Sequence, residues 1–380
     1  MTDYYRYRHI PILLRGEPAT MVGKPGVWNW EDVNPGTAAL IDTMEVHPGD
    51  AVLDLGCGTG IIGLAAARLA PQGHARLVDV SITAIECARR TLADNDLTNT
   101  SVALSDGTDA DQAYDIVLCH LPRGRSVMEA LIQDAALSLR PEGRFYLVAH
   151  KRTGVKSAIA YASRVFGCCA VVRQKKGYHV ALAVKDRPLT LPSPADHHTY
   201  RRFEISVDDQ PVTLVSQPGV FAWDRLDEGT AALVQAMEIS AGESILDLGC
   251  GTGLLALVAA RRGGEVTAVD ADLRAVESAR RTLAANGAAG AVLISDVAQA
   301  VLERRFDVVL CNPPFHQGAG VAYEVARQMV KDAAHVLRPG GRLYLISNVF
   351  LRYEREAAAR FQRIDEVLND RRYRVLRAIR

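Results

Sequence analysis

Residues 245–253 read ILDLGCGTG, an apolar run that ends near an aspartate and passes directly into three closely spaced glycines. Glycine lets the backbone turn tightly and lets a ligand approach it closely. The residues that follow, LLALVAARR, have the composition of a buried helix, and the first N–H groups of a helix lack partners inside it. A strand that runs through a glycine turn into a helix predicts an α/β sheet with a ligand site at that turn.

This stretch belongs to a segment that occurs twice in the chain. Residues 27–60 align without a gap on residues 220–253, and 18 of the 34 positions are identical. The match continues with residues 78–97 on 269–288 and residues 139–148 on 337–346. Self-similarity over such lengths indicates an internal duplication.

Each copy alternates short apolar runs with longer helix-like segments. In residues 83–95 and 274–286 the apolar positions recur every three to four residues, as on one face of a helix. We therefore predict an α/β fold of two tandem duplicated Rossmann-like domains, each a doubly wound, mostly parallel sheet. The proline-rich stretch DRPLTLPSPAD, residues 186–196, predicts a linker, with domains at 1–188 and 197–380.

Composition excludes several classes of protein. The chain has 380 residues, no net charge and 48% hydrophobic residues. The length and the hydrophobic fraction fit two globular domains, and the absence of net charge excludes a polycation. No signal peptide and no apolar run of eighteen residues is present, so we expect a cytoplasmic protein without a membrane partner. Seven cysteines without a C-x-x-C pair predict neither a disulfide framework nor a metal site.

The spacing of acidic residues around the glycines indicates the ligand. Asp247 precedes Gly249, Gly251 and Gly253, and Asp270 ends the next apolar run, where an acid can bind two ribose hydroxyls. Asp296 ends the following run, within reach of an adenine amine. This pattern resembles the class I methyltransferases that use S-adenosylmethionine (SAM), and the resemblance implies SAM as cofactor. A dinucleotide-binding dehydrogenase is the competing interpretation.

The first copy carries the same set of three glycines and three acids, which are Asp54, Gly56, Gly58, Gly60, Asp79 and Asp106. Residues alone leave open whether this copy binds SAM or is an inherited scaffold.

Residues 311–315, CNPPF, indicate the chemistry. An amine on an aromatic ring is a poor nucleophile, because its lone pair is delocalised into the ring. The side-chain oxygen of Asn312 and the carbonyl of Pro313 can accept its two N–H groups, and Phe315 offers a face for stacking a base. We predict Asn312, Pro313 and Phe315 as the catalytic residues.

The first copy reads CHLPR at residues 119–123, without the amide or the aromatic ring. We therefore predict that the N-terminal domain is not catalytic. Clusters of basic residues at 151–156, 173–176, 201–202 and 371–380 are candidates for attracting nucleic acid.

CNPPFHQG, taken with QPGVFAWDRLDEG and ILDLGCGTG, resembles the bacterial ribosomal RNA small-subunit methyltransferase C family. The resemblance covers both halves and implies SAM-dependent methylation of the exocyclic N2 of a guanine in 16S RNA, with ribosomal RNA or the 30S subunit as partner. It also implies an N-terminal domain that docks RNA or supports folding, and a fused duplication favours a monomer.

Three alternatives stay open at this point. One is the sister group of large-subunit guanine-N2 methyltransferases, which shares the NPPF loop. The second is methylation of adenine N6, and the third is an RNA-binding or assembly factor without catalysis.

Overall fold

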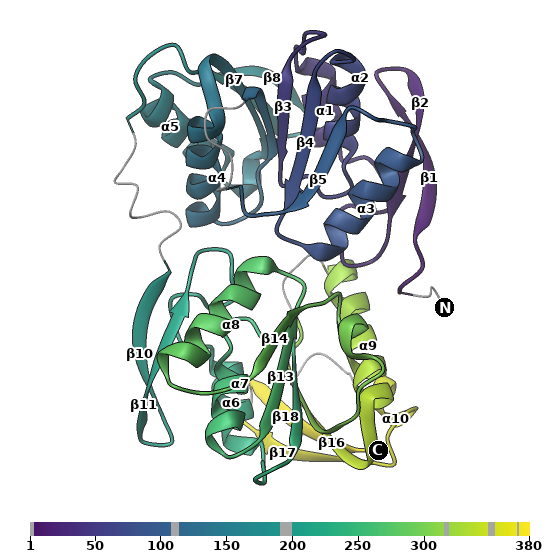
Figure 1. Cartoon of the computed structure of the whole chain (residues 1–380), viewed down its shortest axis with the longest axis vertical. Helices are drawn as coiled ribbons and strands as arrows, with labels where there is room; N and C mark the ends of the chain where they lie inside the picture. Colours follow the sequence, from purple (N-terminus) through teal and green to yellow (C-terminus); the bar gives the residue numbers. More distant parts are fainter. Residues whose placement is uncertain (1–3, 108–113, 191–199, 315–318, 349–353, 371) are drawn as a thin grey trace. The chain divides into compact units, whose positions relative to one another are not determined.

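The computed structural model describes residues 4–107, 114–190, 200–314, 319–348, 354–370 and 372–380. The chain divides into two compact units, Met1–Thr199 and Tyr200–Arg380 (Figure 1). Of the predicted linker, residues 186–196, the part from residue 191 onward lies outside the described residues.

The N-terminal unit is built on a seven-stranded sheet. Its strand order is β5-β4-β3-β6-β7-β9-β8, and β9 is the strand that runs antiparallel to its neighbours. The strands are β3 (Ala51–Leu55), β4 (His74–Asp79), β5 (Thr100–Leu104), β6 (Tyr114–His120), β7 (Leu139–His150), β8 (Ala170–Lys175) and β9 (Tyr178–Val184).

Helices cover both faces of this sheet, because successive strand residues point to opposite sides. Val52 belongs to the core beneath α1, α2 and α3, whereas the next residue, Leu53, belongs to the core beneath α4 and α5. The helices are α1 (Pro35–Thr43), α2 (Ile61–Leu69), α3 (Ile82–Ala93), α4 (Arg125–Ser138) and α5 (Val155–Phe166), with a short 3₁₀ turn η1 (Lys151–Thr153).

The C-terminal unit repeats this architecture. Its sheet has the order β14-β13-β12-β15-β16-β18-β17, with β18 antiparallel to β16 and β17. The strands are β12 (Ser244–Leu248), β13 (Glu265–Asp270), β14 (Ala291–Ile294), β15 (Phe306–Cys311), β16 (Leu337–Asn348), β17 (Arg363–Asn369) and β18 (Tyr373–Ile379). The helices are α6 (Glu228–Ala236), α7 (Leu254–Arg261), α8 (Leu273–Ala285), α9 (Ala319–Val336) and α10 (Glu354–Ala358), with a 3₁₀ turn η3 (Gln299–Val301). The predicted fold of two doubly wound α/β domains is confirmed.

Each unit opens with a two-stranded hairpin that the sequence analysis did not predict. The hairpins are β1 (Arg8–Leu14) with β2 (Glu17–Gly23), and β10 (Arg201–Val207) with β11 (Gln210–Ser216). Figure 1 shows the second one beside α8, where the N–H of Val215 donates to the Oγ1 of Thr282 at 3.0 Å. The N–H of Val22 makes the same bond with Thr91 at 2.9 Å, so the duplication includes the hairpin.

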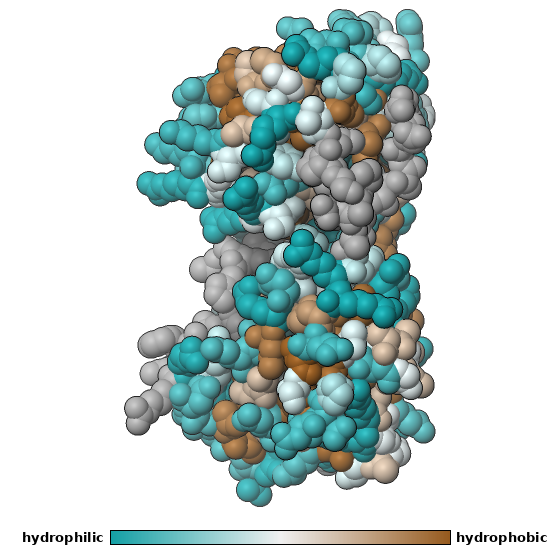
Figure 2. All heavy atoms as spheres, turned by 90° about the vertical axis from the view of Figure 1, so that its left-hand side faces the viewer, coloured by the Kyte–Doolittle hydropathy of each residue, from teal (hydrophilic) through white to brown (hydrophobic). Residues whose placement is uncertain are grey.

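The surface is mixed in character. On the face shown in Figure 2, hydrophobic residues form small groups separated by hydrophilic ones. Within the part of the chain that the structure describes, no helix is long and apolar enough to cross a membrane.

Gly253 provides a test of how tightly the glycine turn is packed. It has a φ of +80°, and a Cβ there would lie 2.7 Å from the Cα of Ala279 in α8. We expect Gly253→Ala to lower the free energy of unfolding by about 3 kcal/mol in a urea titration, because strain and a backbone clash combine. Gly251→Ala is the matched control: its φ is +51° and no heavy atom lies within 4 Å of the added carbon, so about 1 kcal/mol is expected. Equal losses in the two variants would contradict this account.

Candidate active site at the carboxyl edge of the C-terminal sheet

Strand pairing in the C-terminal sheet brings three loops together. Leu248, the last residue of β12, pairs with Val269 of β13 on one side and with Cys311 of β15 on the other. Chain order reverses at β12, and open α/β sheets bind ligands at the carboxyl ends beside such a reversal. Gly249, Asp270 and Asn312 follow these paired residues, so they lie at one edge of the sheet.

The glycine loop is held by backbone hydrogen bonds and by a carboxylate. The N–H groups of Gly249 and Cys250 donate to the carbonyl of Val269 at 2.9 and 3.0 Å. Asp270 accepts the N–H of Gly251 on Oδ2 and the N–H of Asp272 on Oδ1, both at 3.0 Å. Asp270 therefore lies directly against the loop, and burial raises its pKa to about 6.

Asp247 is buried below the same loop. Its Oδ2 accepts the N–H of Ala256 in the first turn of α7 at 2.9 Å, whereas its Oδ1 has no hydrogen-bond partner among the described residues. Burial, together with the nearby charge of Asp270, raises the pKa of Asp247 to about 7.

Asp296 completes the set of acids at this edge. It is buried and follows β14, whose last residue Ile294 pairs with Asp270. The N–H of Ser295 donates to the carbonyl of Asp270 at 2.8 Å. The structure thus brings together at one edge of the sheet the residues predicted to bind the cofactor, Asp247, Gly249, Gly251, Gly253, Asp270 and Asp296, and their contact with SAM stays a prediction.

This arrangement fits SAM, which carries ribose hydroxyls, an adenine amine and a positive charge. Acidic acceptors line the edge, and the described residues leave an open space at Gly251, where none of their heavy atoms apart from the chain neighbours lies within 4 Å of a Cβ position. We expect Asp270 to contact the ribose and the segment at Asp296 to contact the adenine, because acidic side chains accept hydrogen bonds from hydroxyl and amine groups.

Asn312 is held in one orientation by two residues from the start of α6. Its Nδ2 donates to the Oγ1 of Thr230 at 2.9 Å and to the Oδ2 of Asp227 at 3.2 Å. That same Asp227 oxygen accepts both the N–H and the hydroxyl of Thr230, at 2.7 and 3.0 Å. An ionised carboxylate only accepts hydrogen bonds, so the NH₂ end of Asn312 must face Asp227. Its Oδ1 is then the end left to accept N–H groups from a substrate.

The two other predicted catalytic residues are placed less completely. Pro313 is buried directly after β15. Phe315 lies outside the described residues.

Sequence reasoning missed Thr230 at this site and did not single out Phe221, which precedes it in the chain. Thr230 was part of the repeated GTAAL motif, and that repetition was the signal available for it. Phe221 is 54% exposed, although large apolar side chains are mostly buried. Its counterpart in the first copy, Trp28, packs edge-on against His120 with ring centroids 4.8 Å apart.

His120 occupies in the N-terminal domain the position of Asn312. Its Nδ1 is bonded to the Oγ1 of Thr37 at 2.9 Å, and its ring contacts Tyr178 at a centroid distance of 5.7 Å. Burial lowers the pKa of His120 to about 4, so it is neutral at physiological pH. A ring cluster thus stands where the second copy has an amide.

The basic clusters expected to attract RNA differ in whether nearby acidic side chains compensate their charge. Lys151, Arg152 and Lys156 are exposed on η1 and α5. Arg173 and Lys175 both lie near Asp42, at 3.7 and 3.6 Å from its Oδ2, so part of their charge is compensated.

The basic C-terminal segment is mostly a strand and not a free tail. Arg377 of β18 pairs with Asp365 and with Glu238, each at 3.3 Å. The guanidinium of Arg380 donates to the carbonyl of His335 at 2.8 Å. These contacts occupy arginine side chains that the sequence analysis had counted as candidates for attracting RNA.

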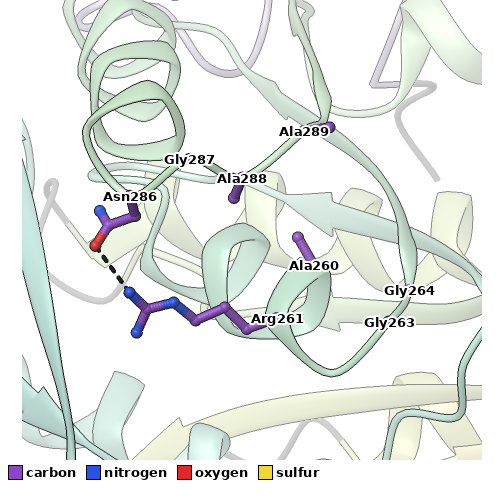
Figure 3. A pocket seen from close by; sticks show the side chains of 8 residues that line it. All are labelled: Ala260, Arg261, Gly263, Gly264, Asn286, Gly287, Ala288 and Ala289. Atoms are coloured by element: carbon purple, nitrogen blue, oxygen red, sulfur yellow. Dashed lines mark hydrogen bonds between the residues drawn. The ribbon is translucent and has the colours of Figure 1, made fainter.

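A shallow pocket in this domain lies away from the candidate site. Figure 3 shows it between the ends of α7 and α8, with a hydrogen bond of 3.1 Å from Arg261 to Asn286. These helix ends lead into the amino ends of β13 and β14, opposite the edge that carries Asp270 and Asn312. Among the described residues, no group of three acidic, histidine or cysteine side chains is arranged to hold a metal ion.

Comparisons with known proteins agree with this geometry. The family model of the methyltransferase small domain matches residues 18–182 and 211–377, one match in each copy. A glycine loop, an acid after the second strand and an Asn-Pro-Pro turn after the fourth, all on a doubly wound sheet, define a SAM-dependent class I methyltransferase.

More specific relatives narrow this class. Ribosomal RNA small subunit methyltransferase C from Pseudomonas entomophila is 36% identical over 64% of this chain and 72% of its own length. The protein of that name from Pseudomonas aeruginosa strain UCBPP-PA14 is 34% identical over 63% and 72%. The solved structure of the Thermus thermophilus 16S rRNA N2 G1207 methyltransferase, in complex with AdoMet and guanosine, is 33% identical over 98% of both chains with a TM-score of 0.86. The chain belongs to the ribosomal RNA small subunit methyltransferase C family.

The raised pKa of Asp247 predicts how stability depends on pH. Because its pKa in the folded chain lies above that of an exposed aspartate, the folded state resists ionisation, and the wild type loses stability as the pH rises from about 4 to about 7. We expect the melting temperature of Asp247→Asn, relative to the wild type, to rise between pH 5 and pH 8 in calorimetry. Asp224→Asn, which replaces an exposed carboxylate by the same amide, is the control for the substitution itself. A flat profile for Asp247→Asn would overturn the argument.

Proposed function

We propose that the C-terminal domain transfers the methyl group of SAM to the exocyclic N2 amine of a guanine in 16S ribosomal RNA. The observation that carries this proposal is the fixed orientation of Asn312. Its NH₂ end is bonded to Asp227 and Thr230, which leaves an oxygen acceptor at the carboxyl edge of β15, beside the glycine loop. A substrate that presents an NH₂ group matches this acceptor, whereas a hydroxyl or carbon nucleophile does not require it.

SAM, when bound, supplies a methyl group activated by a positively charged sulfur. Asp270, beside the backbone of the glycine loop, would hold its nucleoside part. Asn312 Oδ1 and the carbonyl of Pro313 would accept the two N–H bonds of the guanine amine. These bonds turn the nitrogen lone pair out of conjugation and stabilise the positive charge that grows on nitrogen. Breaking of the sulfur–methyl bond leaves SAH, and the methylated nitrogen then loses its extra proton to water, so no charged base is needed at first contact.

The N-terminal domain would serve docking and stability and not transfer. Its counterpart of Asn312 is a neutral His120 bonded to Thr37, which offers no amide oxygen. The exposed basic residues Lys151, Arg152 and Lys156 lie in this domain and suit contacts with phosphates. The names of the relatives favour small-subunit RNA over the large-subunit alternative.

Transfer from tritiated SAM tests the proposed function. We expect label on N2-methylguanine in 16S RNA when the protein is incubated with 30S subunits, and none with 50S subunits. Asn312→Ala should lower kcat about 10²- to 10³-fold with little change in SAM affinity, because it removes an acceptor used in the transition state. Label on adenine N6 or in 23S RNA would refute the assigned substrate.

Thr230→Val separates positioning from contact with the substrate. It is nearly isosteric and removes one of the two bonds that orient Asn312. We expect a smaller loss, about 10-fold in kcat, since the bond that Asn312 donates to Asp227 remains. Thr230→Ser, which keeps the hydroxyl, should restore most of the rate. A loss that Ser fails to restore would assign Thr230 a packing role only.

Phe221 is proposed to support the target base. The side chain is half exposed, and its counterpart Trp28 covers the ring that replaces Asn312 in the first copy. An aromatic face at this place suits stacking on a flat base, which is worth about 1–3 kcal/mol. We expect Phe221→Ala to raise KM for the RNA about 10-fold with unchanged SAM affinity. Phe221→Trp should keep a KM for the RNA close to that of the wild type. Equal RNA affinity in wild type and Phe221→Ala would exclude this role.

A further inference from the structure

We propose that the N-terminal domain also binds an adenosyl sulfur nucleoside, SAM or its demethylated product S-adenosylhomocysteine (SAH), at its own glycine loop. The inference rests on the proposed function in one respect, because it takes the C-terminal loop as a SAM site. It adds a second site that has no transfer chemistry beside it.

The glycine loops of the two domains have the same pattern of hydrogen bonds. Asp79 accepts the N–H of Gly58 on Oδ2 at 3.0 Å and the N–H of Ser81 on Oδ1 at 2.9 Å. These bonds match those of Asp270 with Gly251 and Asp272. Asp79 is therefore placed against its loop as Asp270 is.

The backbone of the first loop is also preserved. Gly56, Gly58 and Gly60 have φ angles of +78°, +55° and +81°, against +83°, +51° and +80° in the C-terminal loop. A Cβ at Gly56 or at Gly58 would meet no heavy atom within 4 Å, so the described residues leave this backbone open to a ligand. A loop kept only for folding would be free to fill that space with side chains.

A buried acceptor provides the second, independent observation. Asp54 is fully buried; its Oδ2 accepts the N–H of Gly63 in α2 at 2.8 Å, and its Oδ1 has no hydrogen-bond partner among the described residues. Below the C-terminal loop, Asp247 likewise has one oxygen that accepts a backbone N–H and one oxygen without a partner among the described residues. A buried carboxylate oxygen without a donor costs free energy, and a ligand that carries an ammonium group close by offsets that cost.

Charge selects the class of nucleoside. Residues 51–62 contain an aspartate at position 54 and no lysine or arginine, and Asp79 adds a second carboxylate to the loop. A nucleoside phosphate would bring more negative charge to this segment, which has no lysine or arginine of its own to balance it. A nucleoside with a free ribose diol and an ammonium group fits, and both SAM and SAH carry these groups.

The neighbouring amine site is closed by side chains. His120 is packed between the rings of Trp28 and Tyr178, and Tyr178 also contacts His150 at a centroid distance of 4.9 Å. The Nδ2 of Asn34 donates to the hydroxyl of Tyr178 at 2.9 Å and holds that ring in place. A nucleoside bound at the first loop therefore has no base beside it to methylate.

Titration of the full-length chain with SAH tests the inference without turnover. Isothermal calorimetry should give a stoichiometry of two for the wild type and of one for Asp79→Asn, while Asp270→Asn loses the other event. ATP should not compete at the first site. A wild-type stoichiometry of one that Asp79→Asn leaves unchanged and Asp270→Asn abolishes would overturn the second site and leave the proposed function intact. No binding in any of the three proteins would instead refute the proposed function.

A second readout covers the case in which Asp79→Asn fails to fold. Ultraviolet irradiation of the wild type with tritiated SAM, followed by proteolysis, should label peptides from both halves of the chain. Label confined to peptides after residue 200, at SAM concentrations up to about 100 times the tighter Kd, would exclude the first site, since any site of comparable affinity would then be nearly full.

Discussion

Parallel pairing of β12 with β13 and β15 is the constraint on which the rest of the C-terminal domain depends. Parallel strands end at one edge, so the residues that follow Leu248, Val269 and Cys311 must meet there. This places an oriented amide at Asn312 beside a loop braced by Asp270. The helices that cover the sheet keep the three strands in this register.

The duplication provides an internal comparison of what cofactor binding and transfer each need. Asp79 and Asp270 make matching bonds to their loops, although only about half of the aligned segment is identical. The two copies diverge at the fourth strand end, where the contact partner of the conserved threonine is His120 in one and Asn312 in the other. The residues that hold the glycine loop are therefore separate from the residues that form the amine site.

Electrostatics shows a similar division of roles. Asp247 and Asp270 at the sheet edge accept hydrogen bonds from backbone N–H groups, and in the proposed function the acids of this edge serve a ligand with a diol and a positive charge. The basic residues that remain exposed, such as Lys151 and Lys156, suit a polyanion, although the chain has no net charge. Basic residues within β18 are engaged in ion pairs, so counting charges along the sequence overstates what is available to RNA.

The sequence by itself determined the two-copy α/β architecture, the glycine loops with their acids and the Asn-Pro-Pro turn, because these features depend on local spacing along the chain. It did not reveal the amino-terminal hairpins, whose strands are stabilised by contacts with α3 and α8 far along the chain. Tertiary structure alone decided that Thr230 and Asp227 orient Asn312, and that Trp28 and Tyr178 enclose His120. The hydrogen bonds among them join residues 82 or more positions apart, and only the packing of helix against sheet brings those residues together.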